Sequence, residues 1–325
     1  MRRRVLLGSA LATPALFALS APSLRAQGFD HTLRIIVPNA PGGTSDILAR
    51  LIAPELTQAL GQSVVVENRA GAGGNIGADV VAKSPPDGHT MLLLDVSVLA
   101  TNPALFPKLP FNVETDLAPV SMVIYAPYIL TVSNKLPVKD ARELVALAKS
   151  RSGGLNAGNS GTGTSSHLTL VALADQWGAA LTHVPYRGGA PALMAVTTSE
   201  ADLTIAGATQ AQPYAVNGQM RAIAVTGPRR LASLPDVPTF RELGWTAEDA
   251  GTWQGLLVQG GTSPERVSLL HKTLREVLAR PALATRIAEL GGEPRADGPE
   301  AFRTWLSRET ERYGKLIRQH NIRLE

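Results

Sequence analysis

The chain repeats one order of elements, a strand, a Gly-rich loop and a helix, and this order narrows the choice of fold. Residues 33–37 (LRIIV) are typical of a buried strand and residues 38–43 of a loop. Residues 44–60 carry apolar side chains three and four positions apart, which predicts a helix. Short strands that alternate with longer helices are typical of an α/β fold with mainly parallel strands. We therefore predict that fold class.

The same order recurs along most of the chain. Further strands are predicted over 63–67, 90–94, 120–125, 128–133, 156–159, 183–185, 201–205, 221–226 and 253–258. Further helices are predicted over 75–83, 138–150, 165–177 and from 264 to the end, with breaks near 281 and over 291–299. A Pro-broken, irregular connection is predicted between residues 95 and 119. Two strand–helix series followed by terminal helices predict two lobes, and the pattern leaves open which strands cross between them.

The first 26 residues are typical of a secretory signal. Three Arg at positions 2–4 precede an apolar run over residues 5–21, and Ala26 offers a small residue for cleavage. A membrane anchor is the alternative, but the run is interrupted by Pro14 and is short for a span of ~20 residues. We therefore predict export with cleavage after Ala26, by the general secretory or the twin-arginine route.

Charge and cysteine content limit the partners. The predicted leader holds four Arg and no acid, and the whole chain of 325 residues has a formal charge of +4, so the remainder is neutral. No basic patch is left to argue for nucleic acid or anionic lipid. The chain has no Cys, which excludes disulfides, thiolate nucleophiles and Cys-ligated metals. Its length is typical of about two domains.

Two loops share one design. Residues 41–46 (PGGTSD) and 159–166 (NSGTGTSS) each join a predicted strand to the start of a predicted helix. Free N–H groups at a helix start carry positive partial charge, and Gly lets a ligand approach the backbone. Together with Ser and Thr hydroxyls they form a site for an anion without Lys or Arg. Simple capping and turn formation is the alternative for either loop alone, and two such loops in different lobes favour binding.

Two charged residues near these loops each have two possible roles. Asp46 lies in the first helical turn, where a carboxylate is favourable through the helix dipole alone, and it could also contact a ligand amine or an ordered water. Arg187 follows the strand predicted over 183–185 within a third Gly-rich segment. It could pair with a ligand carboxylate or lie in solvent.

Residues 71–77 (GAGGNIG) imitate a dinucleotide fingerprint. They follow a predicted strand and open a predicted helix, and Asp95 closes the next strand, in the place of an acid that would bind a ribose. Residues 67–70, however, separate the apolar strand from the first Gly, where the fingerprint needs a tight turn. An exported NAD(P)-dependent oxidoreductase is therefore an alternative function and not the favoured one.

The sequence gives even less support for a hydrolase or for a metal site. Residues 158–162 (GNSGT) lack the closing Gly of a nucleophile elbow. The six His, at positions 31, 89, 167, 183, 271 and 320, show no paired spacing typical of a metal site. We predict no catalytic residue, no metal and no cofactor.

At these loops the chain resembles the Bug family, the extracytoplasmic solute receptors of tripartite tricarboxylate transporters. The resemblance covers essentially the whole chain after the leader, in order. It is carried by residues 36–38 (IVP), 41–50 (PGGTSDILAR), 64–77 (VVVENRAGAGGNIG), 86–88 (PDG), 102–103 (NP), 166–168 (SHL), 183–188 (HVPYRG), 224–226 (AVT) and 234–239 (LPDVPT). Because the Gly segment 71–77 belongs to the pattern of this family, the resemblance also explains the imitation of a dinucleotide site.

The resemblance implies a two-lobed periplasmic-binding-protein fold of type II with two crossing strands, near residues 125–127 and 252–254. Lobe 1 would comprise residues 27–125 and 254–325, and lobe 2 residues 126–253. The ligand would be a small carboxylate, such as a dicarboxylate, tricarboxylate, acidic amino acid or aromatic acid, held as the lobes close. The residues predicted to contact it are Gly43, Thr44, Ser45, Asp46, Asp95, Ser97, Thr162, Gly163, Thr164, Ser165, Arg187 and Gly207.

Two positions depart from the family pattern and put the usual specificity in doubt. Asp95 stands where relatives more often carry a small or hydroxyl residue, and Ala206 and Gly207 replace a common Asp–Asn pair. We hypothesise that Asp95 is a partner for a ligand amine or hydroxyl. The resemblance further implies membrane permease subunits as partners and a periplasmic location, and we expect a monomer. A ligand sensor for a signalling partner would share the same fold and site.

Overall fold

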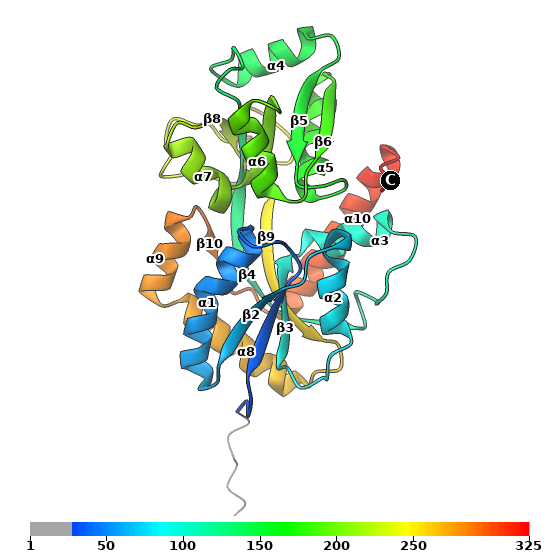
Figure 1. The fold of residues 1–325 in the computed structure, drawn as a ribbon, viewed down its shortest axis with the longest axis vertical. Coiled ribbons are helices and arrows are strands. Elements are labelled where there is room, and N and C mark those ends of the chain that lie inside the picture. The colour runs from blue at the N-terminus through cyan, green and yellow to red at the C-terminus, as the bar shows by residue number, and fades with distance from the viewer. Residues whose placement is uncertain (1–27, 325) are drawn as a thin grey trace, which may run out of the picture.

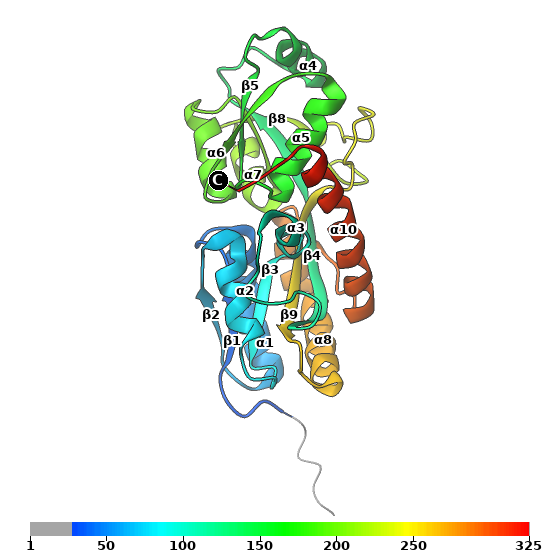
Figure 2. The ribbon, with the colours of Figure 1, turned by 90° about the vertical axis from the view of Figure 1, so that its right-hand side faces the viewer.

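The computed structural model describes residues 28–324, and these form two lobes stacked along the long axis of the molecule (Figures 1 and 2). Each lobe is a β-sheet with helices on both faces, so the predicted α/β fold with two lobes is confirmed. The predicted leader, residues 1–26, lies outside the described residues. Within 28–324 there is no helix with the length and apolar character that a bilayer crossing requires.

Lobe 1 is the lower half in Figure 1 and is built on a mixed sheet in the order β2-β1-β3-β9-β4. Its first three strands are parallel and β9 runs antiparallel to β3. These strands are β1 (Leu33–Val37), β2 (Val64–Asn68), β3 (Thr90–Asp95) and β9 (Gly251–Gln259). Side chains alternate between the faces of a strand, so β1 contributes to two cores. Leu33, Ile35 and Val37 belong to the core under α1 (Thr44–Leu60) and α8 (Pro264–Leu278), and Ile36 to that under α2 (Asn75–Ala82).

Lobe 2 repeats this design in the order β4-β7-β5-β6, with β8 also paired to β4. Its strands are β5 (Leu155–Asn159), β6 (Leu181–Pro185), β7 (Leu203–Gly207) and β8 (Arg221–Val225). Its helices are α4 (Ala141–Ser150), α5 (Ser165–Trp177), α6 (Gly189–Thr198) and α7 (Ala208–Val216). In both lobes a parallel strand is followed by a helix, so helix starts gather at the carboxyl ends of the strands.

One strand, β4 (Leu117–Val132), belongs to both lobes. It pairs with β9 as far as Pro127 and with β7 and β8 from Tyr128 onward. Residues 120–125 and 128–132 form strand as predicted, but the predicted division into two strands was wrong, because β4 is continuous through 126 and 127. Pro127 donates no N–H to a ladder, and it is tolerated here because it lies where the strand changes partners.

Three helices were missed by the sequence analysis. The irregular connection predicted before residue 119 contains α3 (Ser97–Leu105), and α6 and α7 follow β6 and β7. Most of α3 is buried, so it lacks the amphipathic period on which prediction relies, and it contains Pro103. The terminal segment divides into α8, α9 (Pro281–Glu289), the short strand β10 (Glu293–Pro294) and α10 (Pro299–Gln319), in agreement with the predicted breaks.

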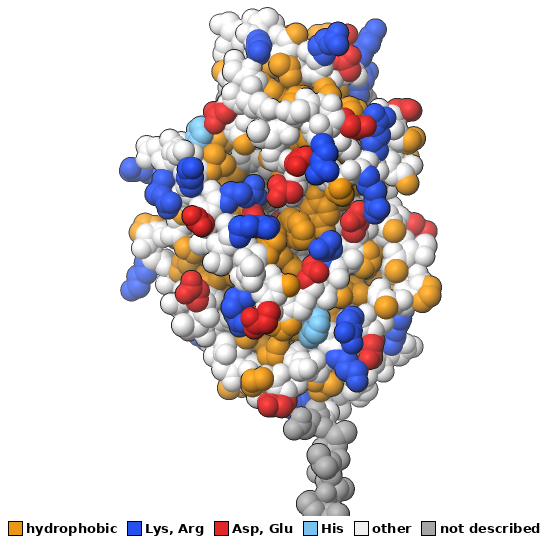
Figure 3. All heavy atoms as spheres, turned by 180° about the vertical axis from the view of Figure 1, so that it is seen from behind, with side chains coloured by type: hydrophobic (Ala, Val, Ile, Leu, Met, Phe, Trp, Pro, Cys, Tyr) orange, Lys and Arg blue, Asp and Glu red, His pale blue; other side chains and the backbone are white. Residues whose placement is uncertain are grey.

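The helix α10 starts in lobe 1 and reaches α5 of lobe 2 (Figure 2). A hydrophobic cluster joins Leu105 of α3, Leu168 of α5 and Ile317 of α10. On the face opposite to Figure 1, basic and acidic side chains are interspersed over both lobes (Figure 3). That face therefore carries no single-sign patch of the kind that binds nucleic acid.

Candidate functional site

The loop before α1 meets lobe 2 at the start of α7. Thr44, the first residue of α1, lies 2.9 Å from Thr209 of α7, measured between the two Oγ1 atoms. Both side chains are buried. Gly207 lies beside them, because a Cβ added there would be 3.6 Å from Thr44 Oγ1 and 2.6 Å from Thr252 Oγ1. Two helix starts from opposite lobes thus face each other across the interface.

The loop before α5 meets lobe 1 at the end of α3. Gly163 has φ +74, and a Cβ added there would lie 2.3 Å from Cδ1 of Leu105. Its N–H donates to Nδ1 of His167 at 2.9 Å, so this donor is used within the loop. The hydroxyls of Ser160, Thr164 and Ser166 bond with one another, which orders the loop. Each of the two predicted anion-binding loops therefore contacts the opposite lobe.

Asp46 organises the first loop. Its carboxylate accepts hydrogen bonds from the N–H of Gly42, from Nε of Arg50 and from Nδ2 of Asn68, each at 3.0 Å. Burial opposes ionisation, but these donors outweigh it and hold the pKa of Asp46 below its usual value. The contacts support the structural reading of Asp46, because they occupy both carboxylate oxygens.

Asp95 ends β3 at the same interface. Its Oδ1 accepts from the N–H of Ser97 at 3.0 Å and from its hydroxyl at 2.7 Å. Burial raises the pKa of Asp95 to about 6, although the bonds from Ser97 oppose the shift. Asp95 is directly opposite Gln254 in the β3–β9 pair, so the two side chains lie on one face of the sheet.

Asp95 belongs to a group of polar residues where the strands cross between the lobes. The Tyr128 hydroxyl is 2.5 Å from Oγ of Ser165, and burial, followed by the charge of Asp95, raises the pKa of Tyr128 well above its usual value. Gln254 is fully buried, and neither of its amide atoms has a hydrogen-bond partner among the described residues. Buried polar groups almost always have partners, so the unpaired amide of Gln254 is an exception. We call Asp95, Ser97, Tyr128, Ser165, Thr252 and Gln254 the central polar cluster.

The other predicted site residues are placed as follows. Ser45 is buried, and its hydroxyl is 3.5 Å from Oδ1 of Asn39 in the same loop. Thr162 is half-buried beside Gly163. Arg187 is exposed and makes no hydrogen bond or ion pair with any residue of 28–324.

Sequence reasoning missed Thr209, Thr252, Tyr128 and Gln254. Thr209 was missed with the helix that carries it. Thr252 and Gln254 lie in the crossing predicted near residues 252–254, so their polar side chains within a strand pattern were the available signal. Tyr128 was placed on a strand, but its partner Ser165 is 37 positions away.

The Gly segment that imitates a dinucleotide site packs against its neighbours. A Cβ at Gly77 would lie 2.7 Å from Cβ of Pro38, so close packing requires Gly at this position. Nδ2 of Asn102 donates to the carbonyl of Gly73 at 3.1 Å, and Phe106 covers the same residue. These contacts give the Gly residues a packing role that needs no nucleotide.

Two α/β lobes that share a crossing strand and meet at paired helix starts have the architecture of periplasmic binding proteins. Comparison with known proteins agrees and is more specific. Residues 48–322 match the model of the tripartite tricarboxylate transporter family receptor, and the chain belongs to that family. The prediction of a Bug-type receptor is thus confirmed.

Named relatives support this assignment. The chain is 34% identical to Protein BugT of Bordetella pertussis over 294 residues, which cover 90% of each chain. It superposes on the periplasmic binding protein BugD with a TM-score of 0.82 and 30% identity, over 91% of this chain and 99% of BugD. A Rhodopseudomonas palustris protein solved with adipate gives 0.84 and 32%, over 90% and 99%. MatC of the same organism, solved with malate, gives 0.79 and 30%, over 88% and 99%. BugD is thus a periplasmic binding protein, and the two Rhodopseudomonas palustris proteins were each solved with a dicarboxylate.

Proposed function

We propose that this protein binds a small carboxylate between its lobes and delivers it to the permease subunits of a tripartite tricarboxylate-type transporter. One observation carries the proposal. Helix starts from opposite lobes, at Thr44 and Thr209, face each other at the interface, where unpaired N–H groups favour an anion. The neighbours solved with adipate and malate hold dicarboxylates, which is the ligand class expected of such a site.

The central polar cluster supports a finer proposal about the ligand. Asp95 would repel a second carboxylate, because its own carboxyl is ionised above a pKa of about 6. An amine or a hydroxyl on the ligand would instead donate to it, and the unpaired amide of Gln254 could bind either group. We propose a carboxylate that carries a hydroxyl or amine at the end nearest Asp95.

Export and assembly complete the proposal. The leader over residues 1–26 would direct the chain to the periplasm and be removed. Lobe 1 would comprise 27–125 and 254–325 and lobe 2 would comprise 126–253, in agreement with the change of partners along β4 at Pro127. The receptor would act as a monomer, with no nucleic-acid partner and no cofactor.

A ligand screen tests the binding function. The purified protein is melted with dicarboxylates, hydroxy acids, acidic amino acids and aromatic acids, with NAD and NADP as negative controls. A true ligand raises the melting temperature, and the rise grows with the ligand concentration. At a hundred times Kd the gain in folding free energy is about 2.7 kcal/mol. Hits are confirmed by calorimetry. No stabilisation by any acid at millimolar concentration would contradict the proposal.

The finer proposal has its own matched test. Malate differs from succinate by one hydroxyl, so calorimetry with both acids on wild type and on Asp95→Ala measures what the hydroxyl gains from Asp95. We expect wild type to prefer malate and the variant to lose that preference. Equal preference in both proteins would refute the role of Asp95 and leave carboxylate binding intact.

A further inference from the structure

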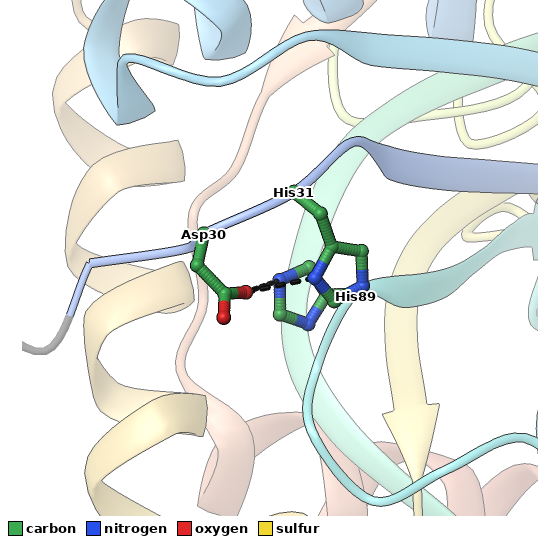
Figure 4. Close-up of side chains that lie close together, drawn as sticks. All are labelled: Asp30, His31 and His89. Atoms are coloured by element: carbon green, nitrogen blue, oxygen red, sulfur yellow. Dashed lines mark hydrogen bonds and ion pairs between the residues drawn. The ribbon is translucent and has the colours of Figure 1, made fainter.

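A second cluster of potential ligand atoms lies far from the interlobe site. Among residues 28–324, Asp30, His31 and His89 each place one carboxylate oxygen or ring nitrogen within 4.8 Å of the others (Figure 4). Asp30 and His31 precede β1, and His89 precedes β3. The cluster therefore lies at the amino ends of these strands, at the end of lobe 1 farthest from lobe 2.

The sheet itself brings these distant positions together. β1 and β3 are parallel neighbours with Arg34 opposite Thr90, and the N–H of Arg34 donates to the carbonyl of His89 at 2.7 Å. The residue before β3 is thus held beside the residues before β1. Spacing along the chain gave no signal of this cluster, which is why the sequence analysis predicted no metal site.

Asp30 occupies the centre of the cluster. Its Oδ1 is 2.7 Å from Nδ1 of His31 and 3.2 Å from Nε2 of His89. The two imidazole rings are stacked with centroids 3.6 Å apart and planes 7° apart. Because the lone pair of an imidazole nitrogen lies in the plane of its ring, His31 must turn out of this stack before both rings can bind one ion.

His89 provides the independent sign of an outside partner. Its side chain is 8% exposed, and neither ring nitrogen makes a hydrogen bond with a described residue, although each lies near a carboxylate oxygen. Nε2 is directed at Asp30, while Nδ1 is 3.3 Å from Oδ1 of Asp87. That Asp87 oxygen also accepts from the N–H of His89 at 2.9 Å, which fixes its position. A metal-bound His usually directs its second nitrogen at a carboxylate, and His89 is arranged in this way.

We propose that Asp30, His31 and His89 bind a divalent transition-metal ion of the zinc class. Two imidazoles and one carboxylate are the donor set that zinc accepts and that Mg²⁺ and Ca²⁺ do not favour. Asp87 acts through His89, by holding the ring in place. His31 has a side chain 60% exposed and is free to adjust, and solvent can supply a fourth ligand.

The bound ion would fasten the first described residues to the sheet. Asp30 and His31 lie in the segment that enters β1, and His89 is fixed to the sheet by its carbonyl. Because the cluster and the central polar cluster lie at opposite ends of lobe 1, the ion would raise stability without changing the affinity for an organic acid. This inference is independent of the proposed transport function.

The test uses the chain from residue 27 without an affinity tag, titrated with Zn²⁺ in a calorimeter. We expect one zinc per chain and a melting temperature that rises with zinc. His31→Ala and His89→Gln should abolish saturable binding. Asp87→Asn should weaken binding by about 10- to 100-fold. His320→Ala, which removes a histidine elsewhere, should bind zinc like wild type, and Mg²⁺ should not bind.

Folding controls keep the test decisive. His31→Ala changes an exposed side chain, so its circular dichroism spectrum should match wild type even if the buried His89 variant is destabilised. Absence of saturable zinc binding to wild type at millimolar concentration would overturn the proposal. Unchanged zinc affinity in folded His31→Ala would overturn it equally.

Discussion

Replacing Gly163 with Ala should weaken ligand binding by obstructing the contact between the lobes. The new Cβ would lie 2.3 Å from Cδ1 and 2.7 Å from Cδ2 of Leu105, across the interface. Overpacking of this kind costs typically about 1–3 kcal/mol. The obstruction exists only when the lobes are together, so it acts on the closed form. At 1.4 kcal/mol per factor of ten, affinity should fall by about 5- to 150-fold.

Gly163→Ala also has a cost that is independent of closure. At φ +74 a residue with a Cβ is strained by roughly 1–2 kcal/mol in any lobe arrangement. This backbone strain lowers the melting temperature of the protein even when no ligand is present. Gly161→Ala is the matched control, since Gly161 has φ +130 in the same loop but its Cβ would meet only atoms of lobe 2, Cγ2 of Thr164 at 3.5 Å and the carbonyl oxygen of Tyr186 at 3.6 Å. It should lower stability and leave affinity nearly unchanged.

A double-mutant cycle with Leu105→Ala isolates the contact. Shortening Leu105 removes the atoms that the new Cβ meets, so Gly163→Ala should change affinity little in that background. The assay is calorimetry with the best acid from the screen, on wild type, both single variants and the double variant. An equal loss of affinity in both backgrounds would refute the steric reasoning and assign the effect to the backbone of the loop.

Three further predictions concern pH and closure. Burial raises the pKa of Asp95 from 3.8 to about 6, so the folded state holds this proton more tightly than the unfolded chain. The free energy of unfolding of wild type should therefore fall by up to about 3 kcal/mol as pH rises from 4 to 6. Asp95→Asn should lack that loss in denaturant titrations, and parallel pH profiles would contradict the assignment. Burial, with a smaller effect of His183, lowers the pKa of His167 from 6.5 to about 4, so its contribution has the opposite sign. Through His167, the free energy of unfolding of wild type should fall by up to about 3 kcal/mol as pH falls from 6.5 to 4. In the same titration His167→Gln should lose less stability. Thr44→Val should remove the hydrogen bond to Thr209 and weaken acid binding about two- to tenfold by calorimetry, and Thr209→Val should add nothing to it if the two hydroxyls act as a pair.

The sequence predicted the elements whose pattern is local. The strand before Pro38, the helix from Thr44 and the helix from Ser165 were found because apolar period, Gly and capping residues agree there. The helices α3, α6 and α7 were missed because they are largely buried, short or interrupted by Pro, so no amphipathic face or clear start is visible. β4 was split at Pro127 because a change of pairing partner leaves no local signal.

The candidate site was predicted in the same uneven way. The two Gly/Ser/Thr loops, over 41–46 and 159–166, could be predicted because a loop of this composition before a helix is a local signal. In the structure both loops contact the opposite lobe. Thr209, Tyr128 and Gln254 depend on contacts between distant elements. The same limit applies to His31 and His89, which are 58 positions apart and meet only because β1 and β3 are adjacent.

The position of α10 has a practical consequence. His320, just after this helix, is 2.8 Å from Asp175 of α5, and Ile317 packs with Leu168. The carboxyl end of the chain therefore spans the boundary between the two lobes. A fluorophore at Ile322 should report ligand occupancy directly, whereas a purification handle or surface tether fused to the carboxyl end would strain this contact and change the measured affinities.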